Sequence, residues 1–224
     1  MIQKVDLPSQ KNMTTYLALL CDLDGTLADT EPQHCAAWLD VLREKYQLDY
    51  DVNWFEQWIG TSDRLVADWL IKEHRLTDSV DEMIGDKQSR FHDLVRISGA
   101  GFPGVAEELA KIQQYYPLAI ATNSGRGDTD VVVPALGLDR FTDVIVTATD
   151  VKNLKPAPDI YLLAAERLSV HAGASIALED SKTGGMEAQA AGYTLLGLAY
   201  VVDIWDWSVY VNTVASYRAV RLRV

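Results

Sequence analysis

The sequence predicts an α/β fold in which a doubly wound parallel sheet carries an inserted helical segment. Short apolar runs without polar alternation recur along the 224 residues, and such runs are typical of strands that are covered on both faces. Helical patterns separate the later runs, so right-handed crossovers and parallel strand pairing are expected. Residues 31–98, in contrast, have helical patterning alone, which indicates an insertion after the first strand.

The first predicted strand is the apolar run Leu17–Cys21, which stops at the polar sequence Asp22–Thr26. Later runs of the same kind are Leu118–Ala121, Val144–Val146, Ser175–Leu178 and Thr194–Leu198. Predicted helices between or after them are Val105–Gln114, Asp159–Leu168 and Lys182–Ala191. Pro158 suits a helix start and Gly192 a helix end. The tail from Asp203 to Val224 has no clear pattern, since Ser208–Val214 fits a strand or a helix.

The inserted segment has four helical patterns: Cys35–Tyr46, Trp54–Ile59, Arg64–Glu73 and Ser79–Val95. Four tryptophans lie in this segment (Trp38, Trp54, Trp58 and Trp69), more than a surface loop would carry. We therefore expect a separate helical domain over residues 31–98 with a small aromatic core, and a sheet domain formed by residues 1–30 and 99–224. The alternative is that the helices pack on the sheet as part of one domain.

Composition excludes several classes of function. The chain has 20 Lys and Arg against 32 Asp and Glu, a net charge of −12, which disfavours binding to nucleic acid or to an anionic membrane surface. An anionic substrate would need a local device such as a bound cation. The polar start and the short apolar runs fit neither a secretory signal nor a membrane span, so a cytoplasmic location is expected. Cys21, at the end of an apolar run, is interpreted as a buried small hydrophobe.

Polar side chains follow the predicted strands at the points where those strands end. Asp22, Thr122 and the pair Glu179 and Asp180 each come directly after an apolar run, and Lys155 lies in a loop before a helix. The carboxyl ends of parallel strands meet at one edge of a sheet, so we expect these groups to converge there. Clustered carboxylates need a counter-cation, and oxygen ligands with open water positions favour Mg²⁺.

This arrangement suits phosphoryl transfer to a carboxylate. Asp22 at a strand end can attack phosphorus, and Asp24 can lie beside it if the chain bends immediately, which Gly25 permits. Thr122 supplies a hydroxyl donor and Lys155 a positive charge for the phosphoryl oxygens. Ser124 is interpreted as a helix cap, which is the commoner role of serine at such a position.

The polar sequences resemble, in order, the four motifs of the haloacid dehalogenase-like hydrolase superfamily. They are Asp22–Thr30 for motif I, Ala119–Thr122 for motif II, Lys155–Asp159 for motif III and Glu179–Gly184 for motif IV. The resemblance spans about Tyr16 to Leu198. It implies a Rossmann-like core, and the helical segment resembles the α-helical cap of the β-phosphoglucomutase-like phosphatases.

The resemblance also implies roles for the motif residues. Asp22 would be the nucleophile and Asp24 the general acid and base. Mg²⁺ would bind the Asp22 carboxylate, the Asp24 backbone carbonyl and Asp180, with Glu179 as a ligand through water or as a supporting residue.

Thr122, the backbone of Asn123 and Lys155 would hold the phosphoryl group. The haloacid dehalogenases of this superfamily lack the second aspartate and the metal, whereas Asp24 and Asp180 are both present here, so dehalogenation is disfavoured. Phosphonate hydrolysis is disfavoured because the second aspartate is present.

Three further residues are candidates for substrate specificity. His34 lies in a sequence resembling the hinge of the cap, where the family histidine contacts the acid/base region; the alternative is a plain surface histidine. Arg64 lies one position later than the arginine that the mutases use for a distal phosphate, and Arg126 lies where mutases have a Ser-Lys-Asn-like stretch. These departures favour a phosphatase acting on a small phosphorylated metabolite. A sugar-phosphate mutase and, less favoured, a non-catalytic binding module are the alternatives.

Overall fold

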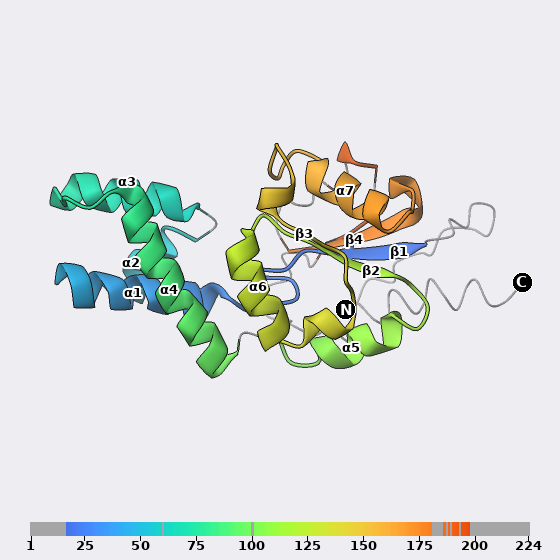
Figure 1. Ribbon diagram of the computed structural model, residues 1–224, viewed down its shortest axis with the longest axis horizontal. Helices are drawn as coiled ribbons and strands as arrows, with labels where there is room; N and C mark the ends of the chain where they lie inside the picture. Colours follow the sequence, from blue (N-terminus) through green and yellow to red (C-terminus); the bar gives the residue numbers. More distant parts are fainter. Residues whose placement is uncertain are drawn as a thin grey trace, which may run out of the picture.

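The computed structural model describes residues 17–59, 61–99, 101–180, 186, 188 and 190–192, together with the backbone of 194–197. Within this part of the chain, five parallel strands form one sheet in the order β3-β2-β1-β4-β5 (Figure 1). The strands are β1 (Ala18–Cys21), β2 (Leu118–Ala121), β3 (Ile145–Val146), β4 (Ser175–Glu179) and β5 (Thr194–Gly197). The predicted doubly wound parallel fold is confirmed.

The two faces of the sheet are covered by different helices, which explains why the strands have no polar alternation. Along β1, Leu19 and Cys21 join an apolar cluster with α5 (Val105–Ile112) and α6 (Arg126–Ala135). The alternate residues Ala18 and Leu20 join a second cluster with α7 (Asp159–Arg167). Successive side chains of a strand point to opposite faces, so a strand with helices on both sides is apolar throughout.

Four helices form a separate lobe beside the sheet (Figure 1). They are α1 (Glu31–Tyr46), α2 (Val52–Glu56), α3 (Asp63–His74) and α4 (Val80–Ser98). We call them the helical lobe. Its own apolar cluster includes Trp38, Trp54 and Phe55, so the expected aromatic core exists.

The helical lobe is nevertheless tied to the sheet region. Ala37 of α1 and Phe91 and Val95 of α4 belong to the apolar cluster of the sheet region. The two chain segments that connect the regions also meet, through an antiparallel bridge between Ala28 and Gly101. The exact domain boundaries, 31 and 98, remain a prediction.

Several element predictions differ from the structure. Helix α1 begins at Glu31 rather than Cys35, with Pro32 in its first turn, where the missing N–H of proline is tolerated. Helix α6 was not predicted, because Gly127, the buried Thr129 and the internal Pro134 obscure its apolar stripe. Most of the predicted helix Lys182–Ala191, and the whole tail from Asp203, lie outside the described residues.

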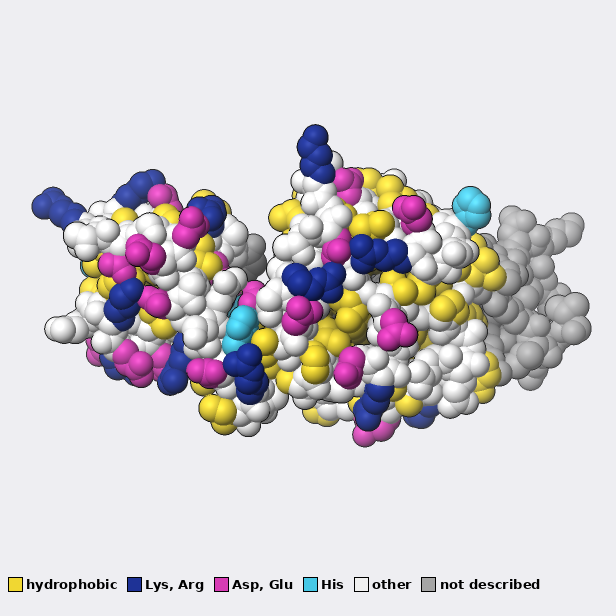
Figure 2. All heavy atoms as spheres, viewed as in Figure 1, with side chains coloured by type: hydrophobic (Ala, Val, Ile, Leu, Met, Phe, Trp, Pro, Cys, Tyr) yellow, Lys and Arg dark blue, Asp and Glu magenta, His cyan; other side chains and the backbone are white. Residues whose placement is uncertain are grey.

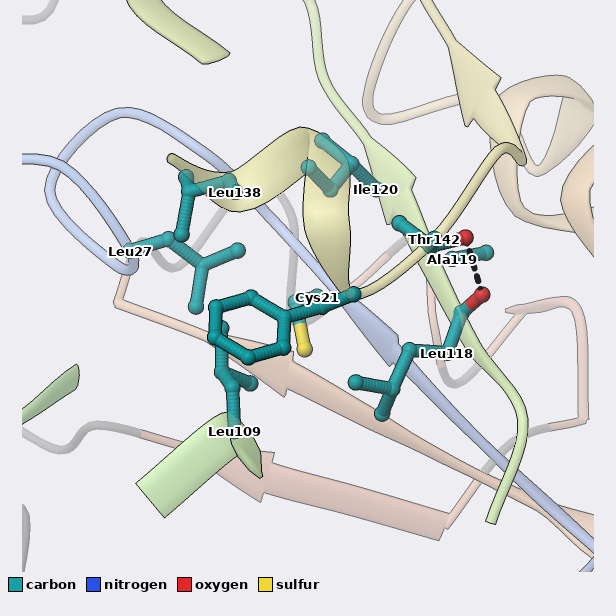
Figure 3. Close-up of a pocket in the computed structure, with 9 residues that line it drawn as sticks. Cys21, Leu27, Leu109, Leu118, Ala119, Ile120, Leu138 and Thr142 are labelled. Atoms are coloured by element: carbon teal, nitrogen blue, oxygen red, sulfur yellow. Dashed lines mark hydrogen bonds between the residues drawn. The ribbon is translucent and has the colours of Figure 1, made fainter. Parts of the chain in front are cut away.

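Cys21 lies in the interior of the sheet region, as predicted. It lines a very small cavity of about 10 Å³ with Leu109, Leu118 and Phe141 (Figure 3). Burial raises the pKa of the Cys21 thiol, and the neighbouring carboxylates of Asp22 and Glu179 raise it further. Because only a thiolate is an effective nucleophile, this cysteine contributes packing rather than chemistry.

None of the helices in the described part of the chain has an apolar stretch of the length that a membrane span needs. Figure 2 shows acidic and basic side chains interspersed over both lobes of the visible face, with a furrow between the lobes. The expectation of a cytoplasmic location stays a prediction.

Candidate active site

The end of β1 turns sharply and brings the two aspartates of motif I to the edge of the sheet. The N–H of Asp22 donates to Leu178 O at 2.9 Å, so Asp22 continues the ladder between β1 and β4. Gly25 then adopts a φ of +80°, in the left-handed region that favours glycine. A Cβ at this position would lie 2.2 Å from Asp180 Oδ2. Glycine is therefore required both for the turn and for the approach of Asp180.

Lys155 is buried at the carboxyl ends of three neighbouring strands. Its Nζ donates to Asp22 Oδ1 at 2.7 Å, to Glu179 Oε1 at 2.5 Å and to Ala121 O at 3.0 Å. Burial alone would lower the pKa of Lys155, but the carboxylates of Asp22 and Glu179 raise it overall. The ammonium group is therefore charged, and it joins motifs I, III and IV in one cluster.

The carboxylates around Lys155 outnumber it. One oxygen each from Asp22, Glu179 and Asp180 lies within 4.8 Å of the other two. Burial raises the pKa of Asp22, against the effect of Lys155, and Glu179 and Asp24 raise it further. Burial, followed by Glu179, also raises the pKa of Asp180. An excess of buried negative charge on oxygen ligands fits a divalent cation.

Two residues that the sequence patterns did not single out donate hydrogen bonds to these carboxylates. Tyr161 Oη donates to Glu179 Oε1 at 2.8 Å, so Glu179 is held by both Tyr161 and Lys155. Thr26 Oγ1 donates to Asp180 Oδ1 at 3.3 Å. Thr26 lies within motif I and could have been suspected, whereas Tyr161 reads in the sequence as one more apolar position of a helix.

The carboxylate of Asp24 lies among hydroxyl groups. Thr30 Oγ1 donates to Asp24 Oδ1 at 2.7 Å, and Thr122 Oγ1 donates to Asp24 Oδ2 at 3.4 Å. Ser124 Oγ also donates to Asp24 Oδ2. The interpretation of Ser124 as a helix cap is wrong, because Gly125 is the N-cap of α6 and the serine hydroxyl points to Asp24.

Asn123 joins the loops of motifs II and III. Its Oδ1 accepts a hydrogen bond from the backbone N–H of Lys155 at 3.0 Å. The side chain of Asn123 thus fixes the loop that carries the lysine, while the expected role of its backbone toward a phosphoryl group stays a prediction.

His34 belongs to α1 of the helical lobe and contacts α4. Its ring stacks on Phe91 with centroids 4.0 Å apart, and Lys87 Nζ lies 2.6 Å from its Nδ1. Burial and then the Lys87 charge lower the pKa of His34 to about 4, so the ring is neutral at pH 7. The ring is half-buried and packs against α4, and its expected contact with the acid/base region stays a prediction.

The two arginines proposed for specificity are committed to other partners. Arg64 Nη2 donates to Asp81 Oδ1 at 2.6 Å, and both side chains are exposed. Arg126 Nη2 donates to Asp150 Oδ2 at 2.6 Å and to Ile145 O at 3.2 Å. The structure thus brings together Asp22, Asp24, Thr122, Asn123, Lys155, Glu179 and Asp180, but places Arg64 and Arg126 in separate ion pairs.

Residues 19–198 match the family described as haloacid dehalogenase-like hydrolase. The chain belongs to this family. The predicted enzyme class, a phosphoric monoester hydrolase, is confirmed together with the family resemblance.

Two curated relatives and one solved structure illustrate the relationship. Fructose-1-phosphate phosphatase YqaB of Escherichia coli is 30% identical over 177 residues, which cover 79% of this chain and 93% of the relative. Phosphorylated carbohydrates phosphatase of Thermotoga maritima is 32% identical over 180 residues, covering 78% and 81%. The structure of β-phosphoglucomutase from Clostridium difficile superposes with a TM-score of 0.69 at 23% identity, covering 93% and 100%; it supports the fold alone.

Proposed function

We propose that this hydrolase is a Mg²⁺-dependent phosphatase that cleaves a small sugar phosphate or similar monoester through a phosphoaspartate on Asp22. The observation that carries the proposal is the cluster of the buried Asp22 and Glu179, both paired with Lys155, and the half-buried Asp180, in which the carboxylates of the described residues outnumber the ammonium group. A dianionic phosphate could approach these carboxylates only if further positive charge were present. Asp22, the backbone carbonyl of Asp24 and Asp180 would hold Mg²⁺, which supplies that charge.

In the first step, a carboxylate oxygen of Asp22 attacks phosphorus and the bond from phosphorus to the ester oxygen breaks. Asp24 donates a proton to the departing oxygen, which leaves as an alcohol. In the second step, Asp24 accepts a proton from a water molecule as the water oxygen attacks the phosphorus of phosphoaspartate. Inorganic phosphate leaves, and Asp22 is regenerated as a carboxylate.

The other motif residues have positioning roles in this proposal. Thr122 and the backbone of Asn123 would donate to the phosphoryl oxygens, and Lys155 would share its ammonium between Asp22 and the transferred group. The hydrogen bond from Lys155 N to the Asn123 side chain supports this arrangement, because it fixes the two loops together.

The named relatives favour a monophosphate over a bisphosphate substrate. A mutase must bind a second phosphate while the first is transferred, and of the candidate cations for that task Arg126 pairs with the half-buried Asp150, whereas the exposed pair of Arg64 with Asp81 is weak and carries no argument. The relatives named as phosphatases of fructose 1-phosphate and of phosphorylated carbohydrates support a sugar monophosphate. The helical lobe beside the site favours a small substrate over a phosphoprotein.

The test is phosphate release from a panel of sugar monophosphates, with fructose 1-phosphate included, before and after removal of Mg²⁺ by a chelator. We expect release that requires Mg²⁺ and no bisphosphate activator. Conversion of a hexose 1-phosphate to its 6-isomer with almost no free phosphate would identify a mutase instead. Turnover that persists in excess chelator would contradict the metal assignment.

A further inference from the structure

The two oxygens of the Asp24 carboxylate accept hydrogen bonds from two different parts of the molecule. Oδ1 accepts from Thr30, which precedes α1 and so belongs to the connection with the helical lobe. Oδ2 accepts from Ser124, which lies in the loop between β2 and α6 of the sheet region. One bond thus depends on the connection to the lobe, and the other depends on the sheet.

The backbone of Ser124 is fixed by hydrogen bonds that do not involve Asp24. Its N–H donates to Thr122 Oγ1 at 3.0 Å, and its carbonyl accepts from Ala148 N at 3.1 Å. Its hydroxyl does not cap α6, since Gly125 is the N-cap. The serine therefore presents a hydroxyl to Asp24 from a loop that is held on both sides.

Thr122 makes a weaker contact with the same oxygen of Asp24. Its hydroxyl donates to Asp24 Oδ2 over 3.4 Å, a long hydrogen bond, while its oxygen accepts the N–H of Ser124. In the proposed function this threonine also donates to the phosphoryl group. Ser124 is then the contact from the sheet region that stays on Asp24 while substrate is bound.

We infer that Ser124 is a positioning residue that orients the acid/base carboxylate of Asp24 from the sheet side, independently of the helical lobe. This inference rests on the proposed function, in which Asp24 protonates the leaving oxygen. A general acid works only within hydrogen-bond reach of the atom that it protonates, so its orientation controls the rate.

The leaving group of the ester separates this role from a general structural one. An alkyl ester such as a sugar phosphate needs protonation of its leaving oxygen, whereas p-nitrophenyl phosphate releases a stable phenolate with little assistance. In Ser124→Ala we expect kcat to fall roughly tenfold to hundredfold for the best alkyl ester and by less than about threefold for the aryl ester, since acid catalysis contributes about 10² or more. KM should change little for either ester.

Two variants complete the experiment. Ser124→Thr keeps the hydroxyl and should restore most of the alkyl ester activity. Ser175→Ala is the matched control, because Ser175 lies at the opposite end of β4 and its hydroxyl donates to the backbone carbonyl of His171. It should leave the ratio of the two rates unchanged.

The outcomes are distinguishable. Equal losses on the two esters in Ser124→Ala, or no recovery in Ser124→Thr although the variant folds with an unchanged Tm, would overturn the role of Ser124 alone. Failure of the wild-type protein to hydrolyse any ester in the presence of Mg²⁺ would overturn the proposed function, and this inference with it.

Discussion

The sheet region and the helical lobe each contain a buried lysine, and the two lysines have different surroundings. Lys155 contacts Asp22 and Glu179, with Asp180 close to both carboxylates. Lys87 is fully buried on α4 between Asp63, at 2.8 Å, and the neutral ring of His34.

The difference lies in the balance of charge. In the helical lobe one ammonium meets one carboxylate, and Trp38 Nε1 also donates to that carboxylate of Asp63 at 3.0 Å. Among the described residues of the sheet region, Lys155 pairs with two carboxylates and a third lies close to both, which leaves negative charge for a cation. A buried charged residue is thus not by itself a sign of catalysis, and the uncompensated charge around it is more informative.

The largest expected effect is the loss of kcat when a carboxylate of the sheet-region cluster is replaced. Asp22→Asn keeps the shape of the side chain but removes the attacking charge, so kcat should fall by at least about 10⁴-fold, as for other catalytic nucleophiles. The measurement is steady-state phosphate release. Asp63→Asn is the matched change beside the other buried lysine. If it reduced kcat as much as Asp22→Asn, the distinction between the two lysine sites would be contradicted.

A steric change at the same cluster should have the next largest effect. In Gly25→Ala the new methyl group would collide with Asp180 Oδ2, and the positive φ adds strain. We expect a loss of roughly 10²-fold in kcat/KM, because small displacements of reacting groups have effects of that size. A Mg²⁺ titration of activity should also shift to higher concentration, while Gly85→Ala, with open space around its Cβ position, serves as the control.

A pH dependence of stability should arise in the helical lobe. The pKa of His34 is lowered to about 4 in the folded protein, whereas an unfolded histidine has a pKa of about 6.5. Between these values the unfolded chain binds more protons, so the stability contributed by the neutral ring is lost as the pH falls from 6.5 toward 4.

The size of this loss is up to roughly 3 kcal/mol of unfolding free energy. It is measured by urea unfolding at several pH values. His34→Gln should flatten that slope, and an unchanged slope in this variant would show that another group is responsible.

The smallest expected effect comes from removing the balanced lysine. Lys87→Met keeps most of the side-chain volume but leaves Asp63 with one partner fewer, so the unfolding free energy should fall by about 2 kcal/mol. Lys72→Met is the control, because the Lys72–Asp68 pair is exposed and such pairs contribute little. A large loss of kcat in Lys87→Met, with no loss of stability, would contradict the distinction between the two lysines.

The convergence of the motif residues could be predicted from the sequence because strand ends are easy to locate. Asp22, Thr122 and Glu179 each follow an unbroken apolar run, and a parallel sheet places such positions at one edge. The existence of the four lobe helices was predictable from their apolar spacing, but their ends were not, since α1 begins at Glu31 rather than Cys35 and α2 spans Val52–Glu56 rather than Trp54–Ile59.

Contacts between side chains from distant segments could not be predicted in this way. Tyr161 donates a hydrogen bond to Glu179, and Ser124 donates one to Asp24, only because the fold places those segments together. The burial of His34 depends in the same way on α4, which follows it by about fifty residues. Local patterns give the position of a residue along an element, but not which neighbour its polar atom meets.

The bridge between Ala28 and Gly101 has a consequence for how the chain folds. Strand β1 pairs with β2 through Leu19 and Leu118, which are separated by the whole helical lobe. Closing so long a loop is entropically unfavourable and slows folding. If the lobe forms first, through its more local helix contacts, α1 and α4 bring Ala28 and Gly101 side by side and the long loop becomes effectively short. We therefore expect early folding of the lobe to speed the pairing of β1 with β2.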